Sequence, residues 1–358
     1  MHNIRIAYIL SNNSFIYKTK IFLKYFLMRR MGFIYPDVFC IPYFINNSNK
    51  IFGIGDHFYT DKFNYIFTEL YAYESQLEYL NNIAKKYPHK LIVILGPPHV
   101  LNNKTSPRGY KLIKSILQNA KLVLSYSYLI KKHYLELAPE SNIELFNWPF
   151  DINTIKKIVK VKNHIGNCNI DILINTPLRF NDSYGLSANE LKKMLNDVMC
   201  SLGEEIASKI LFHSFVYTNE DRNIFYETKF ASGLPLKLHN KLNFKKFVLF
   251  VNNCDVVINF VNPFLLGRIT LISAALNKPG LFGSSEMNDK LYPQSTVSLD
   301  DLENLKNVLI DLIESVYNYD SKLKKFMPNN KEIEQYGNFE LSCKMFSNIL
   351  TNYKFIEK

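Results

Sequence analysis

Short apolar runs alternate with longer amphipathic segments through the first half of the chain, and this pattern predicts strands that alternate with helices. The expected strands are residues 4–10, 38–43, 65–68, 91–95, 122–125 and 143–146, and the expected helices are residues 17–31, 74–86 and 110–119. Strands joined through helices form parallel sheets, so we expect an α/β unit. Functional residues are expected at the carboxyl ends of its strands, where parallel sheets bind ligands.

The same alternation resumes after residue 151 and predicts a second α/β unit. Its expected strands are residues 170–175, 209–215, 236–238, 256–260 and 280–282, with a helix at 187–201, further helices between the later strands, and a final helix at 339–353. A chain of 358 residues is longer than one hydrophobic core usually serves, which favours the same two-unit organisation.

Composition narrows the class of protein. Hydrophobic residues make up 47% of the chain, which is enough for two cores and too much for a disordered protein. The five cysteines are scattered and contain no C-x-x-C pair, which argues against zinc, iron–sulfur and disulfide frameworks and favours a reducing, cytoplasmic setting. The N-terminal residues lack a signal-peptide pattern, and no apolar run reaches the roughly 18 residues of a membrane span.

The formal net charge of +11 indicates anionic partners, and nucleotide diphosphates, lipid headgroups and nucleic acid all fit it. The many Lys, Asn, Ile, Phe and Tyr residues are also what an AT-rich genome encodes. Charge alone therefore does not choose among these partners.

The segment 255–285 combines the features of a phosphate site. An apolar run at 256–260 is followed by a loop, by Gly267 and Arg268 at the expected start of a helix, and by a second apolar run at 280–282. The first turn of a helix has free backbone N–H groups and the positive end of the helix dipole. With a glycine and an arginine at that end, the segment suits a phosphate or diphosphate group.

This segment resembles the donor-sugar site of GT-B glycosyltransferases, whose C-terminal domain carries the pattern E-x-x-G-x-x-x-x-E-A-x-A-x-G-x-P. With the final proline aligned on Pro279, Gly267 takes the first glycine, Ala275 takes the second alanine, and Lys278 matches the usual ending. The departures are Phe264 and Ile272 at the two glutamates, Ser273 at the first alanine and Asn277 at the second glycine. Because those glutamates hold the donor in retaining members, the resemblance implies the fold and leaves retention or inversion open.

The resemblance implies an α/β GT-B architecture of two Rossmann-like domains, with parallel sheets that face each other across a cleft. We expect an acceptor domain at 1–150, a nucleotide-sugar donor domain at 151–335, and a helix at 336–358 that returns to the first domain. The implied enzyme is a glycosyltransferase that moves a sugar from a nucleotide-sugar donor to a hydroxyl of a glycan, a lipid-linked glycan or another acceptor, as in polysaccharide biosynthesis. No metal or other cofactor is implied, because protein cations and helix dipoles serve the diphosphate in this family.

Two arginines are the expected partners of the donor diphosphate. In the family, a glycine-arginine-leucine and then a lysine-glycine follow the first strand of the second domain, whereas this chain keeps Arg179 and Gly185 and has Tyr184 in place of the lysine. A guanidinium donates two parallel hydrogen bonds to phosphate, so Arg179 and Arg268 are predicted to share the leaving group. The other predicted donor-binding residues, besides Gly267, are Ser284, Glu286 and His239, and His239 is expected in a loop just beyond the strand at 236–238.

The predicted catalytic residues lie in the first unit. His99 follows the strand at 91–95, and in neutral form it can accept a proton from an acceptor hydroxyl if the reaction inverts. Glu69, at the end of the strand at 65–68, is a rival base, and so are Asp56 and His57. The sequence does not choose among them.

The expected helix at 17–31 offers a basic surface to an anionic membrane. Lys20, Lys24, Arg29 and Arg30 would each contribute on the order of 1 kcal/mol to such attachment, which would make the protein peripheral on the inner face of a membrane. The alternative is an ordinary helix whose apolar side packs on its own sheet.

Two other functions stay open. Nucleic-acid binding, including DNA modification by a GT-B enzyme, fits the charge, although the aromatic residues fall in core segments rather than on a basic stacking strip. A GT-B chain that binds a ligand without turnover fits the missing glutamates.

Overall fold

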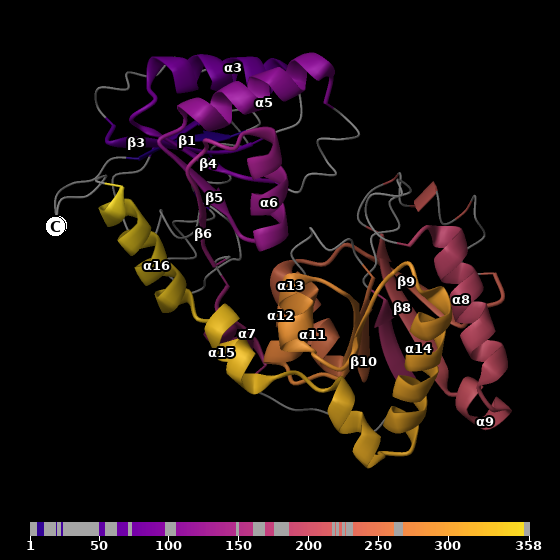
Figure 1. Ribbon diagram of the computed structural model, residues 1–358. Coiled ribbons are helices and arrows are strands. Elements are labelled where there is room, and N and C mark those ends of the chain that lie inside the picture. Colours follow the sequence, from indigo (N-terminus) through magenta and orange to yellow (C-terminus); the bar gives the residue numbers. More distant parts are fainter. Residues whose placement is uncertain are drawn as a thin grey trace. The chain divides into compact units, whose positions relative to one another are not determined.

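The computed structural model describes residues 6–10, 19, 23, 50–53, 63–70, 74–96, 105–147, 150–159, 169–174, 186–216, 219, 222–223, 226, 232–260 and 268–353. The chain divides into two compact units, and Figure 1 labels most of their helices and strands. The N-terminal unit comprises Met1–Asp151 together with Asn338–Lys358, and the C-terminal unit comprises Ile152–Gly337.

The described part of the N-terminal unit contains a six-stranded sheet in the order β2-β1-β3-β4-β5-β6, and every neighbouring pair is parallel. The strands are β1 (Ile6–Leu10), β2 (Lys50–Gly53), β3 (Tyr65–Glu69), β4 (Leu91–Ile94), β5 (Leu122–Ser125) and β6 (Ile143–Leu145). β4 and β5 are buried along their whole length, as strands of a parallel sheet are when both faces are covered.

Helices α3 (Glu74–Lys86), α5 (Pro107–Asn119) and α6 (Tyr128–Leu137) connect the later strands of this sheet. α3 and α5 pack side by side in Figure 1, and Arg108 at the start of α5 forms ion pairs with Glu74 and Glu78 of α3. The hydroxyl of Ser106 accepts a hydrogen bond from the backbone N–H of Gly109 and so caps α5. The cap explains why the helix begins at Pro107 rather than at the predicted residue 110.

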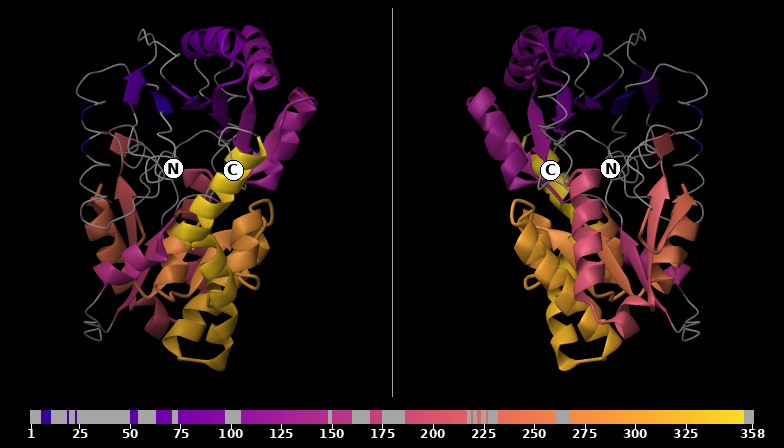
Figure 2. Two further views of the ribbon diagram at one scale, coloured as in Figure 1. Left: turned by 90° about the vertical axis from the view of Figure 1, so that its left-hand side faces the viewer. Right: turned by 90° about the vertical axis from the view of Figure 1, so that its right-hand side faces the viewer.

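The last helix, α16 (Phe339–Asn352), belongs to the N-terminal unit and appears in yellow in both views of Figure 2. Its Phe346 ring lies edge-on to Phe67 of β3, with 6.0 Å between the ring centroids. Just beyond the helix, the hydroxyl of Tyr353 donates a 2.9 Å hydrogen bond to Glu144 of β6. These contacts attach α16 and the residue that follows it to the sheet of the N-terminal unit.

The described part of the C-terminal unit contains a second six-stranded parallel sheet, in the order β12-β11-β10-β7-β8-β9. Its strands are β7 (Ile170–Ile174), β8 (Ile210–Val216), β9 (Leu236–Asn240), β10 (Val256–Asn259), β11 (Gly280–Gly283) and β12 (Thr296–Val297). The main hydrophobic core lies between one face of this sheet and the helices α8 (Ala188–Ser201) and α14 (Leu302–Tyr317).

The opposite face of the sheet carries α11 (Phe244–Asn253), whose Phe250 ring packs on His213 and Phe215 of β8. Two further helices, α7 (Ile152–Ile158) and α12 (Arg268–Ala275), contact α11 and each other. The remaining elements of the unit are α9 (Glu204–Ala207), α13 (Glu286–Leu291), η2 (Ser321–Phe326) and α15 (Asn330–Tyr336).

The predicted α/β class with parallel sheets is confirmed. β2 was not among the predicted strands, and β9 extends two residues beyond its predicted end. The predicted strand at 38–43 lies outside the described residues, as does the predicted helix at 17–31 apart from residues 19 and 23. Within the described part of the chain, no helix combines the length and the apolar character needed to cross a membrane.

Candidate functional site

The order in which strands are added to the C-terminal sheet reverses at β7. The chain runs outward from β7 to β8 and β9, and then returns to the other side of β7 to form β10 and β11. Neighbouring loops diverge where the strand order reverses, and ligands of open α/β sheets bind there, beyond the carboxyl ends of the strands. The reversal therefore marks the carboxyl ends of β7 and β10 as the place for a ligand.

Arg268 is the first residue of α12, the helix that follows β10, and it is exposed. Because β10 and β11 run parallel, the helix between them runs back along the sheet and begins on the side of their carboxyl ends. The backbone N–H groups and the positive dipole end of α12 therefore face the same side as the reversal of strand order. Gly267 and Arg179, two of the predicted phosphate partners, lie outside the described residues.

The loop after β11 is held by its own side chains. The Ser284 hydroxyl donates to the carboxylate of Asp289 at 3.0 Å, and the hydroxyl of Ser285 caps α13 by accepting from the backbone N–H of Asn288. The amide of Asn288 in turn donates to the carbonyl of Gly283 at 2.8 Å. Of the two predicted donor-binding residues here, Ser284 therefore has a local partner for its proton, and Glu286 is half-buried in the first turn of α13.

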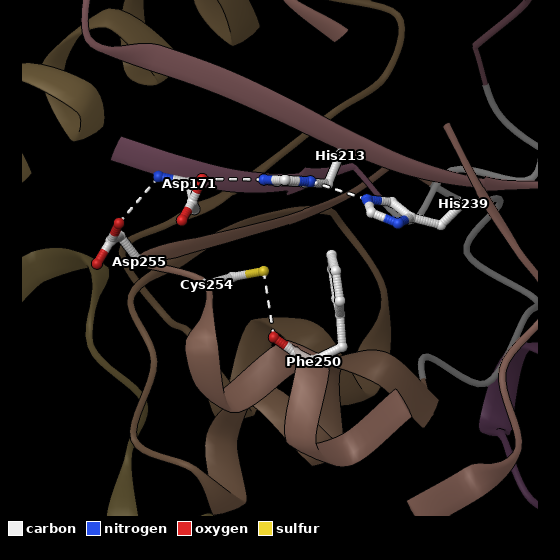
Figure 3. A network of polar contacts seen from close by, with 6 residues as sticks. All are labelled: Asp171, His213, His239, Phe250, Cys254 and Asp255. Atoms are coloured by element: carbon white, nitrogen blue, oxygen red, sulfur yellow. Dashed lines mark hydrogen bonds and ion pairs between the residues drawn. The ribbon is translucent and has the colours of Figure 1, made fainter. Parts of the chain in front are cut away.

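A chain of hydrogen bonds crosses three neighbouring strands of the same sheet, as Figure 3 shows. Oδ1 of Asp171 on β7 lies 2.9 Å from Nε2 of His213 on β8, and Nδ1 of His213 lies 2.9 Å from Nε2 of His239 on β9. The register pairs Leu173 with His213, and Phe215 with His239. Each partner thus stands two residues further along its strand, and the network climbs diagonally toward the carboxyl end of β9.

The first member of this network is fixed by its backbone. The N–H of Asp171 donates to Oδ2 of Asp255 at 2.9 Å, and the N–H of Asp255 donates back to the carbonyl of Asp171 at 2.8 Å. The Cys254 thiol lies beneath the network in Figure 3 and donates to the carbonyl of Phe250 at 3.4 Å. Burial, followed by the negative charge of Asp171, raises the pKa of Cys254, so this thiol stays protonated and is not a nucleophile.

His239 sits among aromatic rings at the edge of the sheet. Its ring centroid lies 4.7 Å from that of Phe250, 5.1 Å from that of His213 and 5.4 Å from that of Phe215. Burial, followed by the charges of His213 and Lys237, lowers the pKa of His239 below its ordinary value of 6.5. The ring is therefore neutral near pH 7.

The network is not a metal centre. Its polar atoms form a line of two hydrogen bonds, whereas metal ligands converge on one point. Across the residues that the structure describes, no three metal-ligating side chains of the His, Cys, Asp or Glu type form a cluster.

Of the residues predicted for catalysis, Glu69 is the last residue of β3 and lies at the carboxyl end of the N-terminal sheet. His99 is outside the described residues, and so are the predicted rivals Asp56 and His57. The basic residues predicted to meet a membrane are also outside them, namely Lys20, Lys24, Arg29 and Arg30.

The sequence interpretation placed His239 in a loop beyond its strand, and this is wrong. His239 lies within β9, because backbone pairing with β8 continues through Phe215–His239 and Val216–Asn240. Sequence reasoning also missed Asp171 and His213. The signal was present, because Asp171 and His213 both interrupt strands that are mostly apolar. A buried polar residue in such a strand needs a hydrogen-bond partner.

No protein-family model and no curated protein sequence matches this chain. Solved structures are nevertheless similar to it over nearly the whole length. The sucrose-phosphate synthase of Thermosynechococcus elongatus is 10% identical, with a TM-score of 0.64 and coverage of 98% of both chains. HepE of Anabaena, solved in complex with UDP and glucose, is 11% identical, with a TM-score of 0.60 and coverage of 97% of this chain and 99% of that one.

A UDP-GlcNAc 2-epimerase from Methanocaldococcus jannaschii is 13% identical, with a TM-score of 0.53 and coverage of 98% of this chain and 100% of that one. At such low identity these similarities establish the fold. The chain has the GT-B fold, and the resemblance predicted from residues 267–279 is confirmed at that level.

Proposed function

We propose that this protein is a glycosyltransferase that transfers a sugar from a nucleotide-sugar donor to a hydroxyl of a glycan, a lipid-linked glycan or another acceptor. The GT-B fold supports the general class of enzyme, and the complex of HepE with UDP and glucose supports the class of donor. The observation that carries the proposal lies in the C-terminal unit. There, an exposed arginine begins the helix that follows β10, beside the reversal of strand order.

The proposed role of Arg268 is to bind the donor diphosphate. Breaking the bond between the sugar and the diphosphate leaves extra negative charge on the phosphate oxygens. A guanidinium and helix N–H groups that are already aimed at those oxygens lower the energy of the transition state. Arg179 and Gly267 are proposed to complete this phosphate site, and His239, Ser284 and Glu286 are proposed to contact the rest of the donor.

The N-terminal unit is proposed to bind the acceptor. His99 or Glu69 would take the proton from the acceptor hydroxyl, and positioning of the two substrates would supply much of the remaining rate. An acceptor at the cytoplasmic face of an anionic membrane is part of the proposal, with Lys20, Lys24, Arg29 and Arg30 as its contacts. No metal is proposed.

A thermal-shift panel of nucleoside diphosphates and nucleotide sugars tests the donor site. A ligand present at a hundred times its dissociation constant adds about 2.7 kcal/mol of stability, so one base should stand out from the others. Arg268→Ala should remove most of that shift, because a hydrogen bond to a charged group contributes about 1.5–3 kcal/mol. Arg108→Ala is the matched control, since Arg108 is an exposed arginine that pairs with Glu74 and Glu78 in the N-terminal unit.

The outcomes separate the candidate functions. Nucleotide binding that Arg268→Ala and Arg108→Ala weaken equally would remove the proposed diphosphate site. A bound nucleotide sugar whose sugar is isomerised without any acceptor would point to an epimerase, a reaction named for one of the similar structures. The absence of any nucleotide shift, together with steeply salt-dependent duplex binding, would replace the proposal with nucleic-acid recognition.

A further inference from the structure

The hydrogen-bond network of Asp171, His213 and His239 ends at Nδ1 of His239. Nδ1 of His239 has no hydrogen-bond partner among the described residues, and Figure 3 shows it on the side of the ring away from His213. His239 is partly exposed and stands next to the last residue of β9. The network therefore connects a fixed carboxylate inside the sheet to one nitrogen near the ligand-binding ends of the strands.

The carboxylate determines where the protons lie. An ionised carboxylate only accepts hydrogen bonds, so Nε2 of His213 must carry a proton to donate to Asp171. In a neutral His213 ring, Nδ1 is then an acceptor, and the hydrogen bond to His239 requires a proton on Nε2 of His239. Nδ1 of His239 is left with a free lone pair, and it presents an acceptor.

Uptake of one proton by the pair of His213 and His239 places a proton on Nδ1 of His239. If His213 takes the proton, its Nδ1–H donates to Nε2 of His239, and the proton of His239 moves to Nδ1. If His239 takes the proton, both of its nitrogens are protonated. In either case Nδ1 of His239 carries a proton, so its character changes from acceptor to donor wherever the charge resides within the pair.

We propose that Asp171, acting through His213, is a positioning residue that sets the tautomer of His239. In that tautomer, Nδ1 of His239 accepts a hydrogen bond from the bound ligand. Nδ1 loses this capacity when the pair of His213 and His239 takes up one proton. The ligand group at this position must then be an N–H or O–H donor. The claim about the tautomer of His239 is independent of the proposed function. The claim about the ligand, called the ligand part below, rests on the proposed binding of a nucleotide donor.

The charged and titratable groups around the pair come from several elements. Asp171 of β7 faces His213, Lys237 of β9 acts on His239, and the Cys254 thiol lies at the end of α11. Asp255 and the buried Lys278 act on Cys254, and Arg222 donates to Asn240 beside His239. On α11, the ring that packs on His239 is Phe250, and Lys246, one turn earlier in the same helix, is exposed.

Nitrogen-detected histidine spectra of the full-length protein test the tautomer without any ligand. In protein labelled with ¹⁵N-histidine at about pH 8, His239 should be protonated on Nε2 and bare on Nδ1, and on acidification its Nδ1 should become protonated. His239→Asn, which removes one set of signals, provides the assignment.

Asp171→Asn tests the positioning role. The amide has the same shape as the carboxylate but can donate as well as accept, so the His239 spectrum should become mixed or reversed. Asp197→Asn, an exposed aspartate on α8, is the matched control and should leave the spectrum unchanged. A protonated Nδ1 at pH 8 in the unmodified protein, or an unchanged spectrum in Asp171→Asn, would overturn the inference.

Titration calorimetry with UDP at about pH 8 and about pH 5 tests the ligand part. In His239→Asn, the Oδ1 atom of the substituted side chain is an acceptor that does not titrate. The pH dependence of UDP binding to this variant therefore measures the effect of protonating UDP itself. Loss of one hydrogen bond should weaken UDP binding to the unmodified protein about tenfold more than binding to the variant. Equal pH dependence would overturn the ligand part. UDP binding at neither pH would count against the proposed function, and the spectra would still decide the tautomer.

Discussion

A β-carbon added at Gly280 would lie 2.5 Å from Cε2 of Phe282 and 2.8 Å from the backbone carbonyl of Val257. Gly280 begins β11, pairs with Val257 of β10 and is buried. A backbone oxygen in the middle of a sheet cannot move aside at low cost, since its own strand pairing would have to shift. Because Gly280 has no β-carbon, β10 and β11 can pack closely at this position.

Gly280→Ala should therefore lower the free energy of unfolding by about 1–3 kcal/mol, the range for an overpacked core. Gly203→Ala is the matched control, because nothing lies within 4 Å of the added carbon and its φ of −60° suits alanine. Urea denaturation of the two variants measures the difference. Equal midpoints would show that the β10–β11 approach tolerates a side chain.

Among the helices, α8 shows how far local sequence determines an element. Ser187 and Glu190 form a capping box, in which the Ser187 hydroxyl accepts from the N–H of Glu190 and the Glu190 carboxylate accepts from the N–H of Ser187. The Ser187 hydroxyl also donates to the same carboxylate at 2.7 Å. The start predicted at residue 187 and the observed start at Ala188 agree, because the signal lies within one turn.

The capping box predicts a pH dependence of stability. Hydrogen bonds from the Ser187 hydroxyl and then from its backbone N–H lower the pKa of Glu190 below its ordinary value of 4.5. A lowered carboxyl pKa contributes stability that is fully present above 4.5 and is lost as the pH falls through the lower folded-state value. The stability difference between the unmodified protein and Glu190→Gln should thus shrink between about pH 5 and pH 3.

Chemical denaturation at a series of pH values measures this difference. Ser187→Ala should cost about 1 kcal/mol at pH 7, as N-cap substitutions do. Glu140→Gln is the matched control for loss of one surface carboxylate, because the exposed Glu140 side chain has no hydrogen bond among the described residues. A Glu190→Gln difference that stays constant with pH would contradict the expected role of the carboxylate.

At the scale of the whole molecule, contacts between segments that are distant in sequence complete the N-terminal unit. Phe346 of α16 is buried against Phe67 of β3, although most of the chain separates them in sequence. The edge strand β2 is a second case. Its apolar run is only Ile51 and Phe52, and it becomes a strand by pairing with β1, where Tyr8 lies opposite Ile51.

Phe346→Ala should destabilise the N-terminal unit selectively. Truncating a buried phenylalanine costs about 3–5 kcal/mol, so amide hydrogen exchange should accelerate in β3 and β4. Exchange in β7 and β8 of the C-terminal unit should be unchanged. Leu249→Ala, at a side chain that is 38% exposed on α11, is the control and should leave β3 protected. Uniform acceleration across both sheets would show that the two units unfold together.

Much of the fold was predictable from sequence because its signals are local. Apolar strands and amphipathic helices alternate over short distances, and that pattern correctly predicted two parallel sheets. The segment 267–279 predicted the GT-B resemblance, which the similar structures confirm for the fold. The predicted roles of Arg268, Ser284, Glu286 and Glu69 stay predictions.

The sequence by itself determined the α/β class, the alternation of strands with helices and the cap of α8, because each depends on residues within a few positions of one another. Only the tertiary structure decided that His239 belongs to β9 and that Asp171, His213 and His239 form one network. These three residues are 42 and 26 positions apart along the chain, and strand register brings them into contact. Register follows from packing and pairing between whole strands, which no local pattern encodes.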